Sequence, residues 1–308
     1  MSIFECVFQN TNNSSHLFMD SKQTFIFVVN PISGGSDKDA IVNAVNDYAA
    51  EHDVSLRYFE STGKYDEQAL RALYEQFPVQ RILVAGGDGT IKMVAEALLG
   101  YEVTIGIFPA GSANGLSVDL ELPAAIEELL PVAFFGEPSP IDMVEINGKM
   151  SLHLSDIGLN ANLIKNYEQG SIRGKLGYFW QSIATLYEQS PPFEVRIETD
   201  EQTLETEAKM VVLANSQRYG TGVTINPRGE LNDGKFEIVV LKSMDLFLIG
   251  KIITGNMPLD SGEVVLISTD KAVIKTKVPV HFQIDGEYCN EQQVLKARIV
   301  QNVLNVAR

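Results

Sequence analysis

Short, wholly apolar runs separated by helical patterns dominate the chain before residue 140. Such runs are typical of strands buried on both faces, and apolar positions at helical spacing lie between them. The strands are expected at 25–29, 54–59, 82–85 and 103–108. The helices are expected at 41–49, 67–77 and 91–99. This alternation predicts an α/β domain with a doubly wound parallel sheet and helices on both faces.

After residue 140 the pattern changes to strand-like segments separated by turn signals. Pro138-Ser139-Pro140 suggests a hinge, and one helix is expected at 178–188. The strands are expected at 143–146, 152–155, 193–199, 209–214, 235–241, 264–268, 272–276 and 280–284. Runs of strands predict a second, β-rich sandwich or barrel domain. The sequence therefore predicts three parts of the chain: an irregular arm at 1–22, an α/β domain at 23–138 and a β-rich domain at 139–308. The C-terminal tail of the last part can return to the first domain.

Three of the expected strands end in glycine-containing loops, at 30–35, 86–90 and 109–114. In parallel sheets, ligands bind beyond the carboxyl ends of the strands, so these loops should share one edge. The middle loop encloses Asp88 between glycines whose N–H groups can cradle a phosphate. A carboxylate repels a phosphate unless it works through a divalent cation or faces a hydroxyl that must lose a proton. Both explanations indicate phosphoryl transfer. The same residues are also explained by a tight strand-to-helix turn in which Asp88 or Thr90 caps the helix.

Charge and cysteine content narrow the function classes. The chain has 24 Lys+Arg against 40 Asp+Glu, a formal net charge of −16, which argues against nucleic-acid binding and against electrostatic docking on anionic lipid. Its 2 cysteines exclude a disulfide framework and fit a reducing cytoplasm. The first 20 residues lack the features of a signal peptide, and charges interrupt the apolar stretch at 236–253. We therefore expect a cytoplasmic protein without a transmembrane helix.

Several motifs in order make the pattern specific. They are Asn30-Pro31-x-Ser33-Gly34, Gly86-Gly87-Asp88-Gly89-Thr90, Pro109-x-Gly111-Ser112-x-Asn114, Ile141-Asp142, Asn232-Asp233-Gly234 and Asp285-Gly286-Glu287. Over residues 24–307 this set resembles the diacylglycerol kinase catalytic-domain family, which also contains sphingosine and ceramide kinases. The resemblance implies a two-domain lipid kinase with ATP and Mg²⁺ as cofactors and an active site between a nucleotide-binding domain and a lipid-substrate domain. It also implies peripheral contact with a lipid substrate at the membrane surface and is compatible with a homodimer.

The resemblance assigns roles residue by residue. The nucleotide would be bound by Asn30, Ser33, Gly34, Thr62, Gly87, Asp88, Gly89, Thr90, Gly111, Ser112 and Asn114. The catalytic residues would be Asp285, which accepts the hydroxyl proton, with Asp88 and Glu287. The metal ligands would be Asp88, Asp142, Asp233 and Glu287. From its residues alone, Asp285-Gly286 is also the favoured pair for a tight hairpin turn.

Three positions depart from the family pattern, and they leave alternatives open. Met93 and Gly115 stand where the family usually has carboxylates, and Asn160 stands where the sphingosine kinase branch often has an aspartate. One alternative is an NAD kinase-like enzyme with a soluble acceptor. Another is a member that binds nucleotide or lipid without turnover. The scattered histidines are expected to be structural: His16, His52, His153 and His281.

Overall fold

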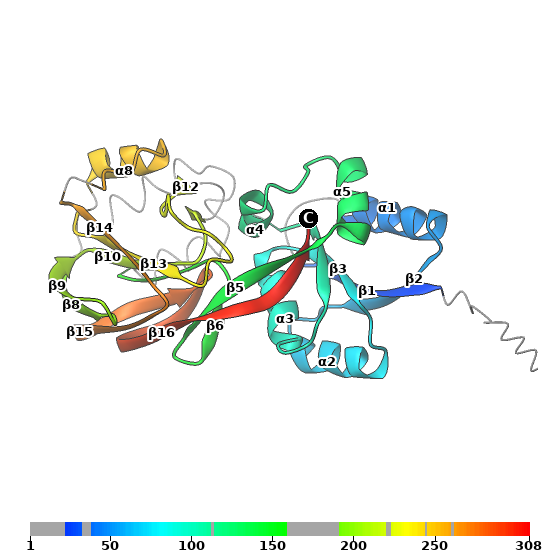
Figure 1. Ribbon diagram of the computed structural model, residues 1–308, viewed down its shortest axis with the longest axis horizontal. Coiled ribbons are helices and arrows are strands. Elements are labelled where there is room, and N and C mark those ends of the chain that lie inside the picture. Colours follow the sequence, from blue (N-terminus) through cyan, green and yellow to red (C-terminus); the bar gives the residue numbers. More distant parts are fainter. Residues whose placement is uncertain are drawn as a thin grey trace, which may run out of the picture.

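The computed structural model describes residues 22–32, 38–111, 114–158, 191–219, 223–243, 245–259 and 262–308. Two lobes lie side by side along its longest axis (Figure 1). Among the described residues, the first lobe contains the four parallel strands and most of the helices, and the second consists almost entirely of strands.

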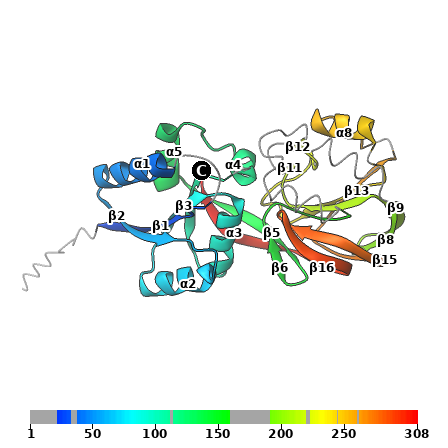
Figure 2. The same cartoon turned by 180° about the vertical axis from the view of Figure 1, so that it is seen from behind.

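The first lobe is the expected doubly wound parallel sheet. Its strands are β1 (Gln23–Val29), β2 (Val54–Glu60), β3 (Arg81–Gly86) and β4 (Thr104–Pro109), in the order β4-β3-β1-β2. Its long helices are α1 (Lys38–Glu51), α2 (Asp66–Gln76), α3 (Asp88–Ala97) and α5 (Ile126–Phe135). The helices α1 and α5 cover one face, and α2 and α3 cover the other (Figures 1 and 2).

Strand β1 shows why the predicted strands of the first lobe are apolar at every position and do not alternate between apolar and polar residues. Ile26 and Val28 point into the core beneath α2 and α3, whereas Phe25 and Phe27 belong to the core on the opposite face. Successive strand side chains point to opposite faces, so a strand covered on both sides must be apolar throughout.

The second lobe is the expected β-rich domain. A mainly antiparallel arrangement runs β14 (Val264–Thr269), β13 (Phe236–Leu241), β10 (Met210–Ala214), β7 (Leu154–Ile157) and β15 (Lys271–Ile284). Beside it lie the hairpin of β8 (Phe193–Glu198) and β9 (Thr203–Ala208) and the short pair of β11 (Arg218–Tyr219) and β12 (Val223–Thr224). The helix expected at 178–188 lies outside the described residues.

One helix of this lobe was not expected. Helix α8 (Leu246–Ile253) begins at Asp245, whose carboxylate accepts a hydrogen bond of 2.7 Å from the backbone N–H of Leu248. An aspartate in this position satisfies one of the free N–H groups of a helix start. None of the helices in the described part of the chain is long and apolar enough to cross a membrane.

Two strands run from one lobe into the other. Strand β5 (Pro138–Ile146), which also pairs with β6 (Lys149–Ser151), lies antiparallel to β16 (Glu287–Ala307). The end of β16 then lies parallel to β4 of the first lobe, so the described strands form one sheet of 14 strands and a separate pair. The C-terminus therefore lies in the first lobe (Figure 1).

The segment Pro138-Ser139-Pro140 does not form the expected hinge. These residues begin β5 and lie in register with Ala307, Val306 and Asn305 of β16. Proline lacks a backbone N–H and is tolerated at the first residue or the edge of a strand. Pro138 is the first residue of β5, and β5 pairs on one side only, with β16, at Pro140.

The C-terminal strand should contribute to the stability of the first lobe. Leu304 is 4% exposed and packs in the core between the sheet and helices α2 and α3. We expect Leu304→Ala to lower the free energy of unfolding by about 2–5 kcal/mol, measured by urea unfolding, because it leaves a cavity. Val294→Ala on the same strand is the control, since Val294 is 43% exposed and should cost far less. Equal losses in the two variants would contradict this role of Leu304.

Candidate active site between the two lobes

The three glycine-containing loops meet at one edge of the parallel sheet, as the sequence predicts. The amide of Asn30 donates a hydrogen bond of 3.0 Å to Thr90 Oγ1, which joins the first loop to the second. The backbone N–H of Ala110 donates to the carbonyl of Gly86 at 2.9 Å, which joins the second loop to the third. Ser33, Gly34 and Ser112 lie outside the described residues.

The second and third loops touch through glycine backbone. A Cβ added to Gly87 would lie 2.9 Å from the Cα of Gly111, closer than such atoms approach in proteins. Asn114 holds the third loop: its side-chain oxygen accepts a 2.7 Å hydrogen bond from the N–H of Gly111, and its amide donates back to the Gly111 carbonyl. Glycine at both positions is thus required by packing.

Asp88 is fixed by the start of helix α4 (Gly115–Asp119). Its two carboxylate oxygens accept hydrogen bonds from the N–H groups of Gly115 at 2.8 Å and Leu116 at 3.1 Å. Burial alone would raise the pKa of Asp88, but His153 and these two N–H groups outweigh burial and lower it. The donor at position 115 is the backbone N–H, which any residue except proline supplies, so the departure at Gly115 does not change this contact.

Lys92 and Asp285 form a buried ion pair between the lobes. Lys92 lies one turn after Asp88 on α3, and its Nζ lies 3.2 Å from Asp285 Oδ2, with the side chains 11% and 8% exposed. Burial would lower the pKa of Lys92, but Asp285, Glu287 and Glu96 raise it, so Lys92 remains an ammonium. One feature of the sequence could have identified Lys92. It lies four residues after Asp88, which places both side chains on the same face of the helix.

Asp285 belongs to the turn between β15 and β16. Asp285 and Gly286 have φ values of 49° and 87°, as a tight hairpin turn requires. The pair therefore forms the hairpin turn and also places the Asp285 carboxylate in the site. The carboxylate also orders the segment that enters β7. It accepts hydrogen bonds from Ser151 Oγ and from the backbone N–H groups of Leu152, His153 and Leu154.

His153 joins the two lobes next to Asp88. Its side chain is 9% exposed, with Nε2 3.5 Å from Asp88 Oδ1 and Nδ1 2.9 Å from Ser216 Oγ. Nδ1 also lies 3.7 Å from Asp119 Oδ2. Burial would lower the pKa of His153, but Asp88, Asp285 and Asp119 outweigh burial and raise it. Its place in the site was not foreseen, because all of its partners are distant in sequence.

The remaining predicted residues have contacts of their own. The hydroxyl of Thr62 donates to Asp66 at 2.9 Å, and the buried carboxylate of Asp142 accepts from the N–H groups of Gly234 and Asn302. The exposed Asp233 accepts from the N–H of Lys235, and Glu287 is exposed beside Lys92. Gly89 lies in the first turn of α3, and Met93 packs against the core of the first lobe. Asn160 lies outside the described residues.

The carboxylates do not fit a Mg²⁺ site built by the protein alone. No group of three or more His, Cys, Asp or Glu side chains in the described ranges is arranged to hold a metal ion. Both oxygens of Asp88, Asp142 and Asp285 already accept backbone N–H groups, and an ammonium lies beside Asp285. Mg²⁺ commonly binds through substrate phosphates and one or two carboxylates, so a metal role for these residues stays a prediction.

Family comparisons cover both lobes. The family described as "Diacylglycerol kinase catalytic domain" matches residues 24–146, and the "YegS C-terminal NAD kinase beta sandwich-like domain" matches residues 156–308. The chain belongs to the diacylglycerol kinase catalytic-domain family.

Curated relatives and solved structures agree with this membership. The chain is 25% identical to a diacylglycerol kinase of Staphylococcus aureus, over 91% of this chain and 89% of that one. It is 28% identical to the uncharacterized protein sll0036 of Synechocystis, of which it spans 50%. A crystal structure of a putative diacylglycerol kinase from Bacillus anthracis matches with a TM-score of 0.76 at 25% identity, over 92% of this chain and 97% of that one.

The Lys92–Asp285 pair should stabilise the contact between the lobes. Lys92→Met leaves the Asp285 carboxylate buried without its cation, so we expect the free energy of unfolding to fall by about 3–5 kcal/mol in chemical denaturation. The double variant Lys92→Met/Asp285→Asn should lose less than the sum of the single variants. Lys22→Met removes the exposed pair with Asp53 and should cost about 1 kcal/mol or less. Additive losses at Lys92 and Asp285 would show that the pair does not couple the lobes.

His153 should make stability depend on pH. Its pKa in the folded protein lies above the value of about 6.5 for an unfolded chain, so its stabilising contribution is complete below that value and is lost as the pH rises through the folded pKa. We expect His153→Gln to lower the free energy of unfolding by about 1–3 kcal/mol near pH 6, and by less near pH 9. Denaturant titrations at both pH values would measure the difference, with His52→Gln on the exposed end of α1 as the control. A loss that does not change with pH would rule out this charge on His153.

Proposed function

We propose that the protein is an ATP-dependent lipid kinase that transfers the γ-phosphoryl group of ATP to a lipid hydroxyl. Membership in the diacylglycerol kinase family supports the kinase class, and relatives named diacylglycerol kinase support a lipid acceptor. A lipid acceptor would bring the protein to a membrane surface from the cytoplasm by peripheral contact.

The observation that carries this proposal is the meeting of charges from both lobes beside the glycine loops. Asp88 lies at the sheet edge of the first lobe, while Asp285 and His153 come from the second lobe and contact Lys92 and Asp88. Phosphoryl transfer depends mainly on positioning and on neutralising charge, which fixed charges from both lobes supply. The start of α3, where Gly89 is exposed and a Cβ there would meet nothing within 4 Å, suits the phosphates of ATP.

In the proposed reaction the lipid hydroxyl oxygen forms a bond to the γ-phosphorus as the bond to the β–γ bridging oxygen breaks. ADP leaves, and the hydroxyl proton passes to a carboxylate. Asp285 accepts four hydrogen bonds and also contacts Lys92. Because a carboxylate offers about four acceptor positions, those of Asp285 are already filled. Asp88 accepts two and is partly exposed. These contacts favour Asp88 as the proton acceptor and Asp285 as the residue that positions Lys92.

Transfer from radiolabelled ATP to a panel of acceptors tests this function. The panel contains dioleoylglycerol, monooleoylglycerol, sphingosine, ceramide and NAD, with and without MgCl₂; NAD is included because of the NAD kinase-like second domain. We expect transfer to a lipid, and we expect Asp88→Asn to reduce kcat by about 100-fold or more, as loss of a general base does. Asp47→Asn, an exposed position on α1, is the matched control.

The outcomes separate the alternatives. Transfer to NAD alone would replace the lipid kinase with a soluble-acceptor kinase. ATP binding without transfer to any acceptor would favour a binding protein without turnover. If Asp285→Asn removes the acidic limb of the pH–rate profile and Asp88→Asn does not, Asp285 is the proton acceptor instead.

A further inference from the structure

Helix α3 brings a buried ammonium group to the boundary between the lobes. The helix lies on the side of the first lobe that faces the second lobe (Figures 1 and 2). The side chain of Lys92 on this helix is 11% exposed, and its Nζ meets Asp285 of the second lobe at 3.2 Å. The proposed reaction takes place at the same boundary, because the glycine loops belong to the first lobe and the acceptor is expected in the second.

The ammonium of Lys92 has hydrogen-bond donors to spare. An ammonium carries three N–H donors. Burial would lower the pKa of Lys92, and Glu287 and Glu96 help Asp285 to raise it, but neither glutamate forms an ion pair with Nζ. Among the described residues, only Asp285 pairs with this group. Buried polar groups usually have their donors satisfied, so the spare donors indicate an acceptor that arrives with a ligand.

The start of α3 is the place where such a ligand fits. Helical side chains tilt toward the N-terminal end of their helix, so Lys92 is directed toward the turn that holds Asp88 and Gly89. Gly89 lies three residues before Lys92 and is exposed, and the space where its side chain would be is open. A helix start with an open glycine accommodates a phosphate, whose charged oxygens are strong acceptors for an ammonium.

Asp285 holds the ammonium in place. Its carboxylate accepts hydrogen bonds from Ser151 Oγ and from three backbone N–H groups, so its own position is fixed. Protein kinases use a comparable arrangement, in which a glutamate on one element pairs with the lysine that contacts the phosphates of ATP. Because Asp285 belongs to the second lobe, Lys92 is held in this way only while the two lobes are in contact.

We propose that Lys92 binds the γ-phosphate of ATP and that Asp285 positions Lys92 for this contact. The inference rests on the proposed function, in which ATP is the phosphoryl donor. The γ-phosphate is the group that must reach the acceptor, so it belongs at the boundary where Lys92 meets Asp285. ADP lacks this group, and Lys92 should therefore distinguish ATP from ADP.

Nucleotide selectivity tests this role. Calorimetry without an acceptor compares the non-hydrolysable β,γ-imido analogue of ATP with ADP, both in the presence of MgCl₂. We expect the wild-type protein to bind the analogue more tightly than ADP. Lys92→Met should weaken binding of the analogue by about tenfold or more, as loss of a charge-assisted hydrogen bond does, and binding of ADP by less than about threefold. An unchanged ratio of the two affinities, or a wild-type protein that binds ADP as tightly as the analogue, would overturn the proposal.

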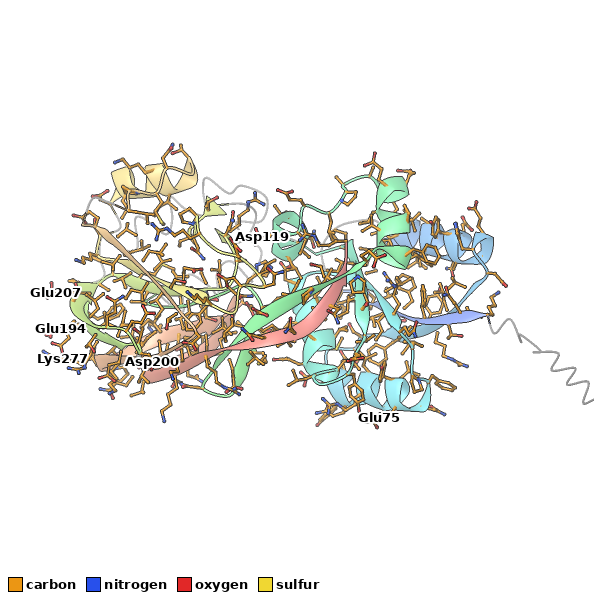
Figure 3. The ribbon with its side chains drawn as sticks, viewed as in Figure 1. Glu75, Asp119, Glu194, Asp200, Glu207 and Lys277 are labelled. Atoms are coloured by element: carbon orange, nitrogen blue, oxygen red, sulfur yellow. The ribbon has the colours of Figure 1, made fainter. Side chains whose placement is uncertain are left out.

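Two further comparisons separate phosphate binding from the stabilising effect of the ion pair. Lys92→Met/Asp285→Asn and Asp285→Asn differ only in the ammonium, so the double variant should show the lower ratio, and it replaces Lys92→Met if that variant does not fold. Equal ratios in these two variants would assign Lys92 to the contact between the lobes alone. Lys277→Met is the matched control and should keep both affinities, because it removes an ammonium from an exposed pair with Glu194 at the end of the second lobe farthest from the first (Figure 3).

These outcomes do not depend on turnover. If binding of the ATP analogue depends on Lys92 but no acceptor is phosphorylated, the kinase function fails and the phosphate contact stands. If a lipid is phosphorylated and the ratio of affinities does not depend on Lys92, the kinase function stands and the phosphate contact fails. A wild-type protein that binds neither nucleotide contradicts both.

Discussion

The antiparallel pairing of β5 with β16 determines how the two lobes face each other. Both strands run from the β-rich lobe into the parallel sheet, and Asp142 on β5 accepts a hydrogen bond from the backbone N–H of Asn302 on β16. Asp285 lies in the turn just before β16 begins, so the same strand that completes the first lobe also positions the carboxylate that meets Lys92. A shift along this pairing would separate the charges of the site.

Two buried cations hold together acidic groups that would otherwise repel each other. Lys92 lies beside Asp285, and His153 lies between Asp88 and Asp119. The chain has a net charge of −16, so without these cations the carboxylates of the two lobes would repel each other. Coulomb interactions at such distances are much stronger between buried side chains than in water, so the arrangement is sensitive to the loss of either cation.

The sequence predicted the parallel half of the fold well, because strands buried on both faces leave an unambiguous apolar run. It missed β16, whose polar residues and register shift between Val300 and Leu304 disrupt the alternation of a strand. The glycine loops and Asp88 were recognisable because their chemistry is local. Lys92, His153 and Asp119 were not recognised as a group, because only the contact between the lobes brings their partners near.

The late position of β16 in the chain has a consequence for folding during synthesis. The first lobe is translated early and β4 pairs there with β3, yet β4 receives its second partner only after residues 305 and 306 have been made. Until then β4 presents an open edge of backbone N–H and C=O groups, which is a site for pairing with other chains. The nascent first lobe is therefore open to such pairing until β16 is in place.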